Sequence, residues 1–324
     1  MAGRLRDLDL NSLSLRDIYY LSEDNFEEDL DFLKNCTSYD MVASIFPKNP
    51  YSEYGFKNLS RKDIQSVLSV VKHVEISTLL ENTSEILTGE HLEELNFSGP
   101  LDAKVKHVSS MHTLDLKALA NLNSLGLPVN SHSSSAINFS ENTSLKELRA
   151  SHLKTGGLNC PSNLKNLSEL RVLDLFRCKV RDFEFISHLK GLRFLEYSYS
   201  RSIRDVSVLG SLYNLERIDF ESCPNLENLE ALAKLPKLRV LRLNKCRSVQ
   251  SLSFLQDTGV ECLEFYETSI KDNDLSFLVQ MQNLKIVRYS HKRSYNAPNQ
   301  KTMDKEIDSD LWYNYTSDVS QYLD

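Results

Sequence analysis

The chain has 324 residues, of which 41% are hydrophobic and 26% are charged, a composition typical of folded globular proteins. Its formal net charge of −7 disfavours non-specific nucleic-acid binding, because that binding depends on basic side chains that neutralise phosphates. No run of about eighteen apolar residues occurs, so the sequence predicts no membrane span.

The beginning of the chain and its cysteines both favour a cytoplasmic protein. The stretch MAGRLRDLDLNSLSLRD contains Arg4, Arg6 and Asp7 and no apolar run, so we expect no secretory signal. The six cysteines form no Cys-x-x-Cys pair, and no histidine lies at ligand spacing from a cysteine cluster. We therefore expect reduced thiols, no bound metal and no cofactor.

Residues 1–70 differ in pattern from the rest of the chain. The apolar residues of SEDNFEEDLDFLKN recur at helical spacing, and Ser60 with Asp63 forms a capping-box-like start for a second helix through about Val70. We therefore expect a mainly helical N-terminal capping region. The stretch RLRDLDLNSLSL is also compatible with a degenerate strand.

One phrase recurs from residue 71 onward, most clearly as LRVLDLFRC at 170–178 and LRVLRLNKC at 238–246. If the second leucine is position 0, residues −3, 0 and +2 are apolar and residue +5 is small. The clear anchors at position 0, spaced 22 to 24 residues apart, are Leu173, Leu195, Ile218, Leu241, Leu263 and Val287. Weaker copies upstream are centred on Val74, Leu95, Leu125 (with Asn130 at +5) and Leu148.

The phrase resembles the leucine-rich repeat, L-x-x-L-x-L-x-x-[N/C]-x-L, and the short units resemble its SDS22-like and internalin-type subclass. The resemblance implies an α/β solenoid: a curved right-handed array with a concave parallel sheet, a helical N-terminal cap and a short C-terminal cap. It divides the chain into a capping region at 1–70, a repeat domain at 71–292 and a C-terminal cap or tail at 293–324. Within the repeat domain, residues 71–166 are irregular and residues 167–292 regular.

The alternation around each anchor predicts one short strand per unit. Side chains at 0 and +2 lie in the core, and those at −1, +1 and +3 face outward. Position +5 follows a turn, where a small inward side chain satisfies neighbouring backbone groups. We therefore expect Cys178, Cys223 and Cys246 to be buried and unreactive. Cys262 is at −1 and should be more accessible.

The last segment, 293–324, is acidic overall but contains several aromatic residues, among them Trp312, Tyr313, Tyr315 and Tyr322. We expect a cap whose aromatic side chains cover the last repeat. A partner-binding tail is the alternative.

The sequence contains no Gly-rich phosphate loop, no His-Glu-x-x-His and no Gly-x-Ser-x-Gly, so we expect no catalysis. At +1, Asp219, Arg242, Glu264 and Arg288 alternate in charge, which predicts ion pairs along a solvated face. Aromatic and arginine side chains together are typical of binding hot spots. The predicted partner-binding residues on and around the concave face are Asp174, Phe176, Arg177, Phe194, Glu196, Tyr199, Arg242 and Tyr266.

We therefore expect a non-catalytic, cytoplasmic interaction module that binds a protein partner as a scaffold, inhibitor or regulatory subunit. It should be a monomer apart from that partner, with neither nucleic acid nor membrane as a ligand. Two alternatives remain. One is a GTPase-activator-like regulator that supplies an arginine such as Arg177, Arg242 or Arg288, and the other is a secreted surface-recognition protein.

Overall fold

A computed structural model describes most of the regular repeats and parts of the preceding region. The described residues are 18–35, 42–45, 61–76, 92–97, 121–127, 144–151, 166–180, 183–298 and 319–323. The chain divides into two compact units, Met1–Leu167 and Ser168–Asp324. None of the described helices is long and apolar enough to cross a lipid bilayer.

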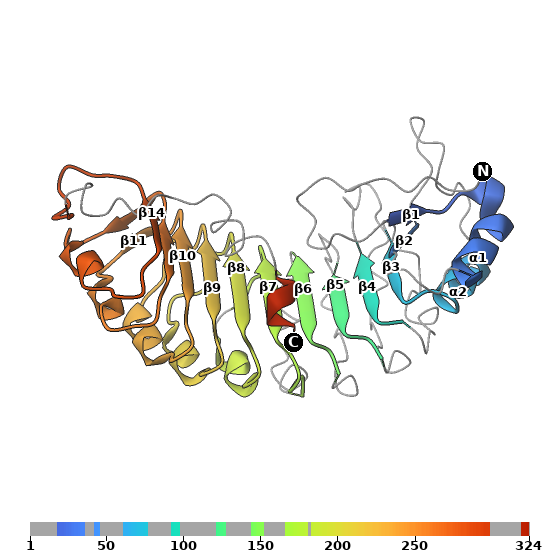
Figure 1. Ribbon diagram of the computed structural model, residues 1–324, viewed down its shortest axis with the longest axis horizontal. Coiled ribbons are helices and arrows are strands. Elements are labelled where there is room, and N and C mark those ends of the chain that lie inside the picture. The colour runs from blue at the N-terminus through green and yellow to red at the C-terminus, as the bar shows by residue number, and fades with distance from the viewer. Residues whose placement is uncertain are drawn as a thin grey trace. The chain divides into compact units, whose positions relative to one another are not determined.

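The first unit contains parallel strands that pair in chain order (Figure 1). They are β1 (Ile18–Tyr20), β2 (Val42–Ile45), β3 (His73–Ile76), β4 (Glu94–Phe97), β5 (Ser124–Leu127) and β6 (Glu147–Ser151). The weak repeat copies pair anchor to anchor: Val74 with Leu95, Leu95 with Leu125, and Leu125 with Leu148. The 30-residue step from Leu95 to Leu125 is therefore one long unit. Asn130 lies outside the described residues.

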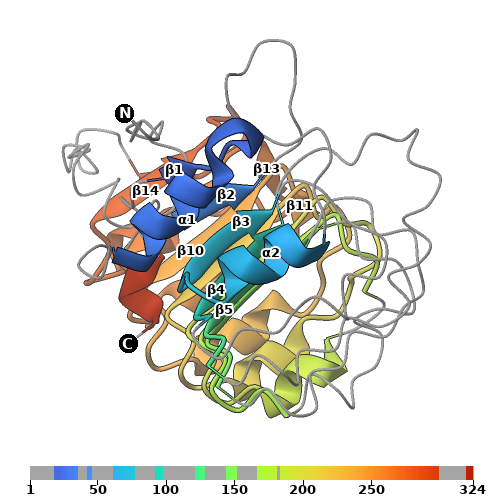
Figure 2. The same ribbon diagram turned by 90° about the vertical axis from the view of Figure 1, so that its right-hand side faces the viewer.

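Two helices accompany these strands at the beginning of the unit, α1 (Phe26–Asn35) and α2 (Arg61–Leu68) (Figure 2). The second helix begins directly after Ser60, as the capping pattern predicts. The strands β1 and β2 were not expected: β2 pairs with β3, and Ala43 is in register with the anchor Val74. Helices and strands thus both occur within residues 1–70, and the capping role of this region stays a prediction.

The second unit contains the regular repeats. Its main strands are β7 (Val172–Phe176), β8 (Phe194–Ser198), β9 (Arg217–Glu221), β10 (Val240–Asn244), β12 (Cys262–Phe265) and β14 (Ile286–Tyr289). Every neighbouring pair is parallel and in register at the predicted anchors. The anchors from Leu173 to Leu263 have no exposed surface, whereas Val287, on the last strand, is half-buried. Stacked leucines therefore form one continuous core, which confirms the predicted repeat register.

Short 3-10 turns bring the chain back between the strands of this unit. They are η4 (Glu184–His188), η5 (Ser207–Ser211), η6 (Leu229–Lys234), η7 (Ser253–Leu255) and η8 (Ser276–Val279). Each contributes buried apolar side chains to the core, such as Leu209, Leu232 and Leu255. A second small sheet pairs β11 (Arg247–Val249) with β13 (Thr268–Ile270).

The chain turns away from β7, β8, β9, β10 and β12 through a left-handed residue at +4. The φ angle there is between 52° and 56° at Arg177, Tyr199, Ser222, Lys245 and Glu267. This conformation costs a non-glycine residue about 1–2 kcal/mol. Hydrogen bonds offset the cost, since the first four of these amides donate to the +3 carbonyl of the next unit, as from Tyr199 to Glu221 at 2.7 Å. The fifth, from Glu267, donates to the Oγ of Ser290 at 2.9 Å.

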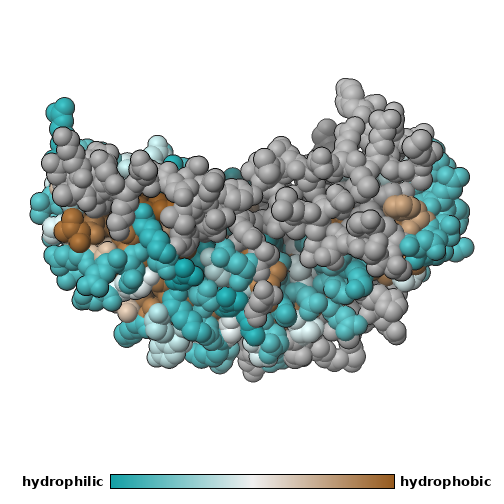
Figure 3. All heavy atoms as spheres, in the orientation of Figure 1, coloured by the Kyte–Doolittle hydropathy of each residue, from teal (hydrophilic) through white to brown (hydrophobic). Residues whose placement is uncertain are grey.

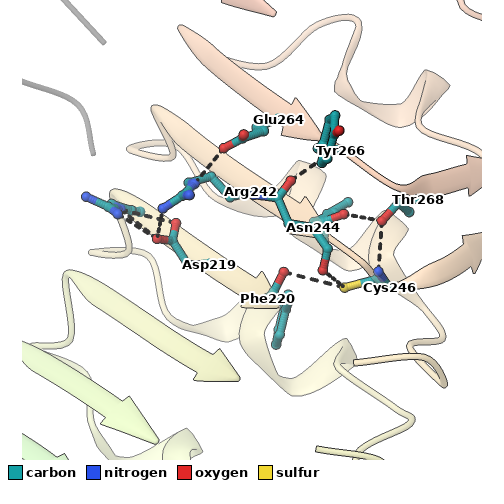
Figure 4. Close-up of polar contacts among 10 residues, drawn as sticks. Asp219, Phe220, Arg242, Asn244, Cys246, Glu264, Tyr266 and Thr268 are labelled. Atoms are coloured by element: carbon teal, nitrogen blue, oxygen red, sulfur yellow. Dashed lines mark hydrogen bonds and ion pairs between the residues drawn. The ribbon is translucent and has the colours of Figure 1, made fainter. Parts of the chain in front are cut away.

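The small +5 side chains form an internal ladder of hydrogen bonds. The Sγ of Cys223 donates to the Tyr197 carbonyl at 3.2 Å, and the Sγ of Cys246 donates to the Phe220 carbonyl at 3.4 Å (Figure 4). Each bond runs to the +2 carbonyl of the preceding unit. Burial raises the pKa of both thiols to about 12. The predicted ladder role is therefore confirmed for these residues.

The Cys262 side chain is buried, contrary to the sequence-based expectation. Its side chain has no exposed surface and packs between Val240 and Ile286, the −1 residues of the neighbouring strands. Burial raises the pKa of the Cys262 thiol to about 12. The prediction of an accessible thiol is wrong, because the outward −1 side chains bury one another.

We expect Cys178, Cys223, Cys246 and Cys262 to resist alkylation in the native protein, because each is buried and the thiolate is the reactive form. All four should react after denaturation, and peptide mass spectrometry reports each site separately. Cys223→Ser should lower the free energy of unfolding by about 1–2 kcal/mol, since the hydroxyl fits the sulfur site imperfectly. Native modification at the denatured rate would contradict this account.

Candidate protein-binding surface

The outward strand face is defined here as the side chains at −1, +1 and +3 of β7 to β10 and β12, together with the +4 residues that follow. It places the predicted binding residues at three levels. Phe194 lies at the start of its strand; Asp174, Glu196 and Arg242 lie in the middle. Phe176, Arg177, Tyr199 and Tyr266 lie at or just beyond the strand ends. Four residues separate the level of Phe194 from that of Phe176, which is about 13 Å along a strand.

Phe176, Arg177 and Tyr199 form a compact group, here called the edge cluster. The rings of Phe176 and Tyr199 meet edge to face with centroids 5.2 Å apart. The Cζ of Arg177 lies 5.2 Å from the first centroid and 5.3 Å from the second. Arg177 and Tyr199 are exposed, while Phe176 is half-buried. The structure therefore brings these three of the predicted binding residues into contact.

Neighbouring charges hold the edge cluster in place. The Tyr199 hydroxyl donates to Oε1 of Glu221 at 3.0 Å, and Nζ of Lys245 lies 3.2 Å from the same oxygen. Tyr266 is half exposed but lies at the end of β12, so β9 and β10 separate it from the cluster. Tyr266 is thus a separate aromatic contact point on the same face.

The middle level is an ion-pair network centred on Asp219. Its Oδ2 lies 2.5 Å from Nη2 of Arg217 and 3.1 Å from Nη1 of Arg242. Arg242 also binds Glu264, with Nε 2.8 Å from Oε2 (Figure 4). The side chains of Arg217 and Asp219 are only 3% and 6% exposed. The expected alternation of charge is present, but at these residues the face is buried rather than solvated.

Glu196 lies beside this network. Burial is the main cause that raises the pKa of its carboxyl group, and the neighbouring Asp219 carboxylate adds to it. A hydrogen bond that Ser198 Oγ donates to Oε1 at 2.9 Å acts in the opposite direction, as do the two nearby arginines. Burial and the charge of Asp219 therefore disfavour the ionised form of Glu196, and a basic partner group close to this carboxylate would stabilise it.

The C-terminal segment covers the first level of the face. Val319 and Tyr322 are each 4% exposed and pack against Val172 and Phe194. The rings of Tyr322 and Phe194 have centroids 5.5 Å apart. Phe194 points outward as expected, but it is covered by its own chain.

The role of 293–324 as a C-terminal cap stays a prediction. Tyr295 packs on the last repeat, where the centroids of its ring and the Tyr289 ring are 6.2 Å apart. Tyr322 contacts β8 instead, and β9, β10 and β12 separate β8 from the last strand. Trp312, Tyr313 and Tyr315 lie outside the described residues.

Sequence reasoning missed Arg217. Its guanidinium binds Asp219, and its Cζ lies 4.6 Å from the centroid of the Phe194 ring. A signal existed, because the −1 residues of the six regular strands are otherwise uncharged. They are Val172, Phe194, Arg217, Val240, Cys262 and Ile286.

No protein-family model matches the sequence, and no curated protein matches it. Among solved structures, the chain is similar to an internalin of Listeria monocytogenes, with a TM-score of 0.51 and 15% identity over 84% of this chain and 74% of that one. It is also similar to a leucine-rich-repeat protein of Leptospira interrogans, with a TM-score of 0.52 and 14% identity over 78% of this chain and 62% of that one. At this identity the likeness concerns the fold alone. Together with the in-register anchors and the +5 ladder, it identifies the chain as an α/β solenoid of leucine-rich repeats.

Proposed function

We propose that this protein is a non-catalytic interaction module that binds a protein partner on the outward strand face, with the edge cluster as the main contact. The observation that carries the proposal is the group of the half-buried Phe176 and the exposed Arg177 and Tyr199 at the ends of adjacent paired strands. Aromatic and arginine side chains dominate binding energy at protein interfaces. A cytoplasmic location is also part of the proposal.

The edge cluster is preorganised for binding. Arg177 and Tyr199 have fixed left-handed backbones, and the Tyr199 hydroxyl is bound to Glu221. Side chains that are already ordered lose little entropy when a partner binds. A partner therefore gains most of the contact energy that these groups offer.

The rest of the surface supports recognition by a small cluster rather than by a broad apolar patch. Among the described residues on the side of the molecule drawn in Figure 3, most are hydrophilic, and the hydrophobic ones form small separate areas. Below the edge cluster, Asp174 and Glu196 lie side by side on β7 and β8. Two adjacent carboxylates complement a basic partner side chain, and such charges mainly increase the rate of association.

Phe176→Ala and Tyr199→Ala are each expected to weaken partner binding by about 2 kcal/mol or more, roughly thirtyfold in Kd, because each removes one of the two aromatic rings of the edge cluster. Both side chains lie outside the core, so the free energy of unfolding should change by about 1 kcal/mol or less. Calorimetric titration of the purified partner measures the affinity, and thermal melting measures the stability.

Glu230→Ala is the matched control, because Glu230 is exposed on η6, away from the outward strand face. It should change neither affinity nor melting. If Glu230→Ala weakens binding and the two aromatic changes do not, the proposed face is wrong.

The GTPase-activator alternative receives no specific support from the described contacts. Arg242 is bound to Asp219 and Glu264, and Arg177 is stacked on two rings. An arginine that enters another protein's active site must leave such contacts. A turnover assay with Arg177→Ala tests this alternative directly.

A further inference from the structure

The segment Val319–Leu323, which includes η9 (Ser320–Tyr322), lies against the first level of the outward strand face (red in Figure 1). Val319 and Tyr322 are almost fully buried there, and Leu323 packs on the same apolar group. These three residues share one side of a helical turn, because positions i, i+3 and i+4 lie together. The segment is therefore seated by a defined pattern, apolar-x-x-Tyr-apolar.

The receiving surface matches this pattern chemically. Val172 and Phe194 provide its apolar floor. The Cζ of Arg193 lies 5.9 Å from the centroid of the Tyr322 ring, and the Cζ of Arg217 lies 4.6 Å from that of the Phe194 ring. Each of the two rings thus has a guanidinium within cation–π distance.

The environment of the Tyr322 hydroxyl favours a tyrosine at this position of the bound segment. Burial raises the pKa of Tyr322 to about 12, although the charge of Arg217 acts in the opposite direction. A phenol beside a buried guanidinium keeps a polar neighbour while its ring leaves water. A segment with tyrosine at this position therefore fits better than one with an aliphatic residue.

Capping does not explain this placement. A C-terminal cap covers the last strand of a solenoid, here β14, but the segment lies on β7 and β8. It covers a face whose strands are already paired and whose end is not open. Its position does coincide with the face proposed to bind a partner.

We propose that the surface formed by Val172, Phe194, Arg193 and Arg217 is a docking site for a short peptide segment of the form apolar-x-x-Tyr-apolar. The chain's own residues 319–323 fill this site until a partner segment of the same chemistry replaces them. The inference rests on the proposed function and specifies the partner chemistry for one part of the face. A tethered segment competes at an effective concentration in the millimolar range, so a modest intrinsic affinity keeps the site filled.

The test uses the full chain and a fluorescent peptide, SDVSQYLD, which reproduces residues 317–324. Tyr322→Ala in the chain weakens the internal competitor, so this variant should bind the peptide at least tenfold more tightly than the unmodified chain. A peptide with alanine in place of its tyrosine should not bind. Tyr213→Ala is the matched control, since Tyr213 is exposed on another part of the unit, and it should bind as the unmodified chain does.

Changes in the receiving surface complete the test. In the Tyr322→Ala background, Phe194→Ala should abolish peptide binding. Arg193→Ala, which removes only a partly exposed side chain, should weaken it about threefold, the effect of one cation–π contact. Arg193→Ala keeps the apolar floor intact, so it gives an answer even if Phe194→Ala fails to fold.

Equal binding by the Tyr322→Ala and unmodified chains would overturn the proposal, as would full binding after Arg193→Ala and Phe194→Ala. This outcome is distinct from failure of the proposed function. The peptide assay needs no partner, whereas the proposed function is judged by partner affinity after Phe176→Ala and Tyr199→Ala.

Discussion

Leu241→Ala is expected to lower the free energy of unfolding by about 3–4 kcal/mol. Leu241 has no exposed surface and stacks in register between Ile218 and Leu263. Truncation therefore leaves a cavity that faces two neighbouring units. Because each unit is stabilised mainly by its neighbours, hydrogen exchange should accelerate in β9, β10 and β12 together.

Val287→Ala is the comparison for this prediction. Val287 is the last anchor of the described strands, is half-buried, and pairs with Leu263 on one side. Its truncation should cost less than half as much as that of Leu241 and should affect exchange only near β14. Equal costs in chemical denaturation would contradict stacking as the source of stability.

Asp219→Ala is expected to cost about 3 kcal/mol, because it leaves the buried Arg217 without its bound carboxylate. Arg242 would lose one of its two carboxylates as well. The loss of a charge partner is expensive here since water cannot replace it. Thermal and denaturant unfolding measure the effect.

Glu227→Ala serves as the control, because Glu227 forms a similarly short ion pair with Arg204, 2.6 Å against 2.5 Å for Asp219 with Arg217, in an exposed position. Exposed ion pairs contribute about 0–1 kcal/mol, so this change should be small. If the two substitutions cost the same, burial does not determine the strength of the Asp219 network.

The repeat register was predictable from the sequence because its cause is local. Apolar residues at −3, 0 and +2 alternate on a strand, and the +5 cysteines follow at a fixed distance. The same periodicity placed Phe176, Arg177 and Tyr199 together, since positions +3 and +4 of adjacent units are neighbours once the register is known.

Other features depend on contacts that no local pattern encodes. The left-handed +4 turns use Arg177, Tyr199 and Lys245, residues that rarely adopt positive φ, so the sequence gives no glycine or asparagine signal. The contact of Tyr322 with Phe194 joins residues 128 positions apart. It depends on side-chain fit between a tail and a distant strand, which periodicity does not report.

A hydrogen-exchange footprint of the partner complex tests most directly whether the partner binds on the outward strand face. With a purified native partner, protection should increase at 172–177, 194–199 and 217–222, the strands and turns that carry the edge cluster and the Asp219 network. Protection should stay unchanged in the 3-10 turns at 184–188, 207–211 and 229–234. A footprint confined to those turns, with the strand residues unaffected, would contradict the account.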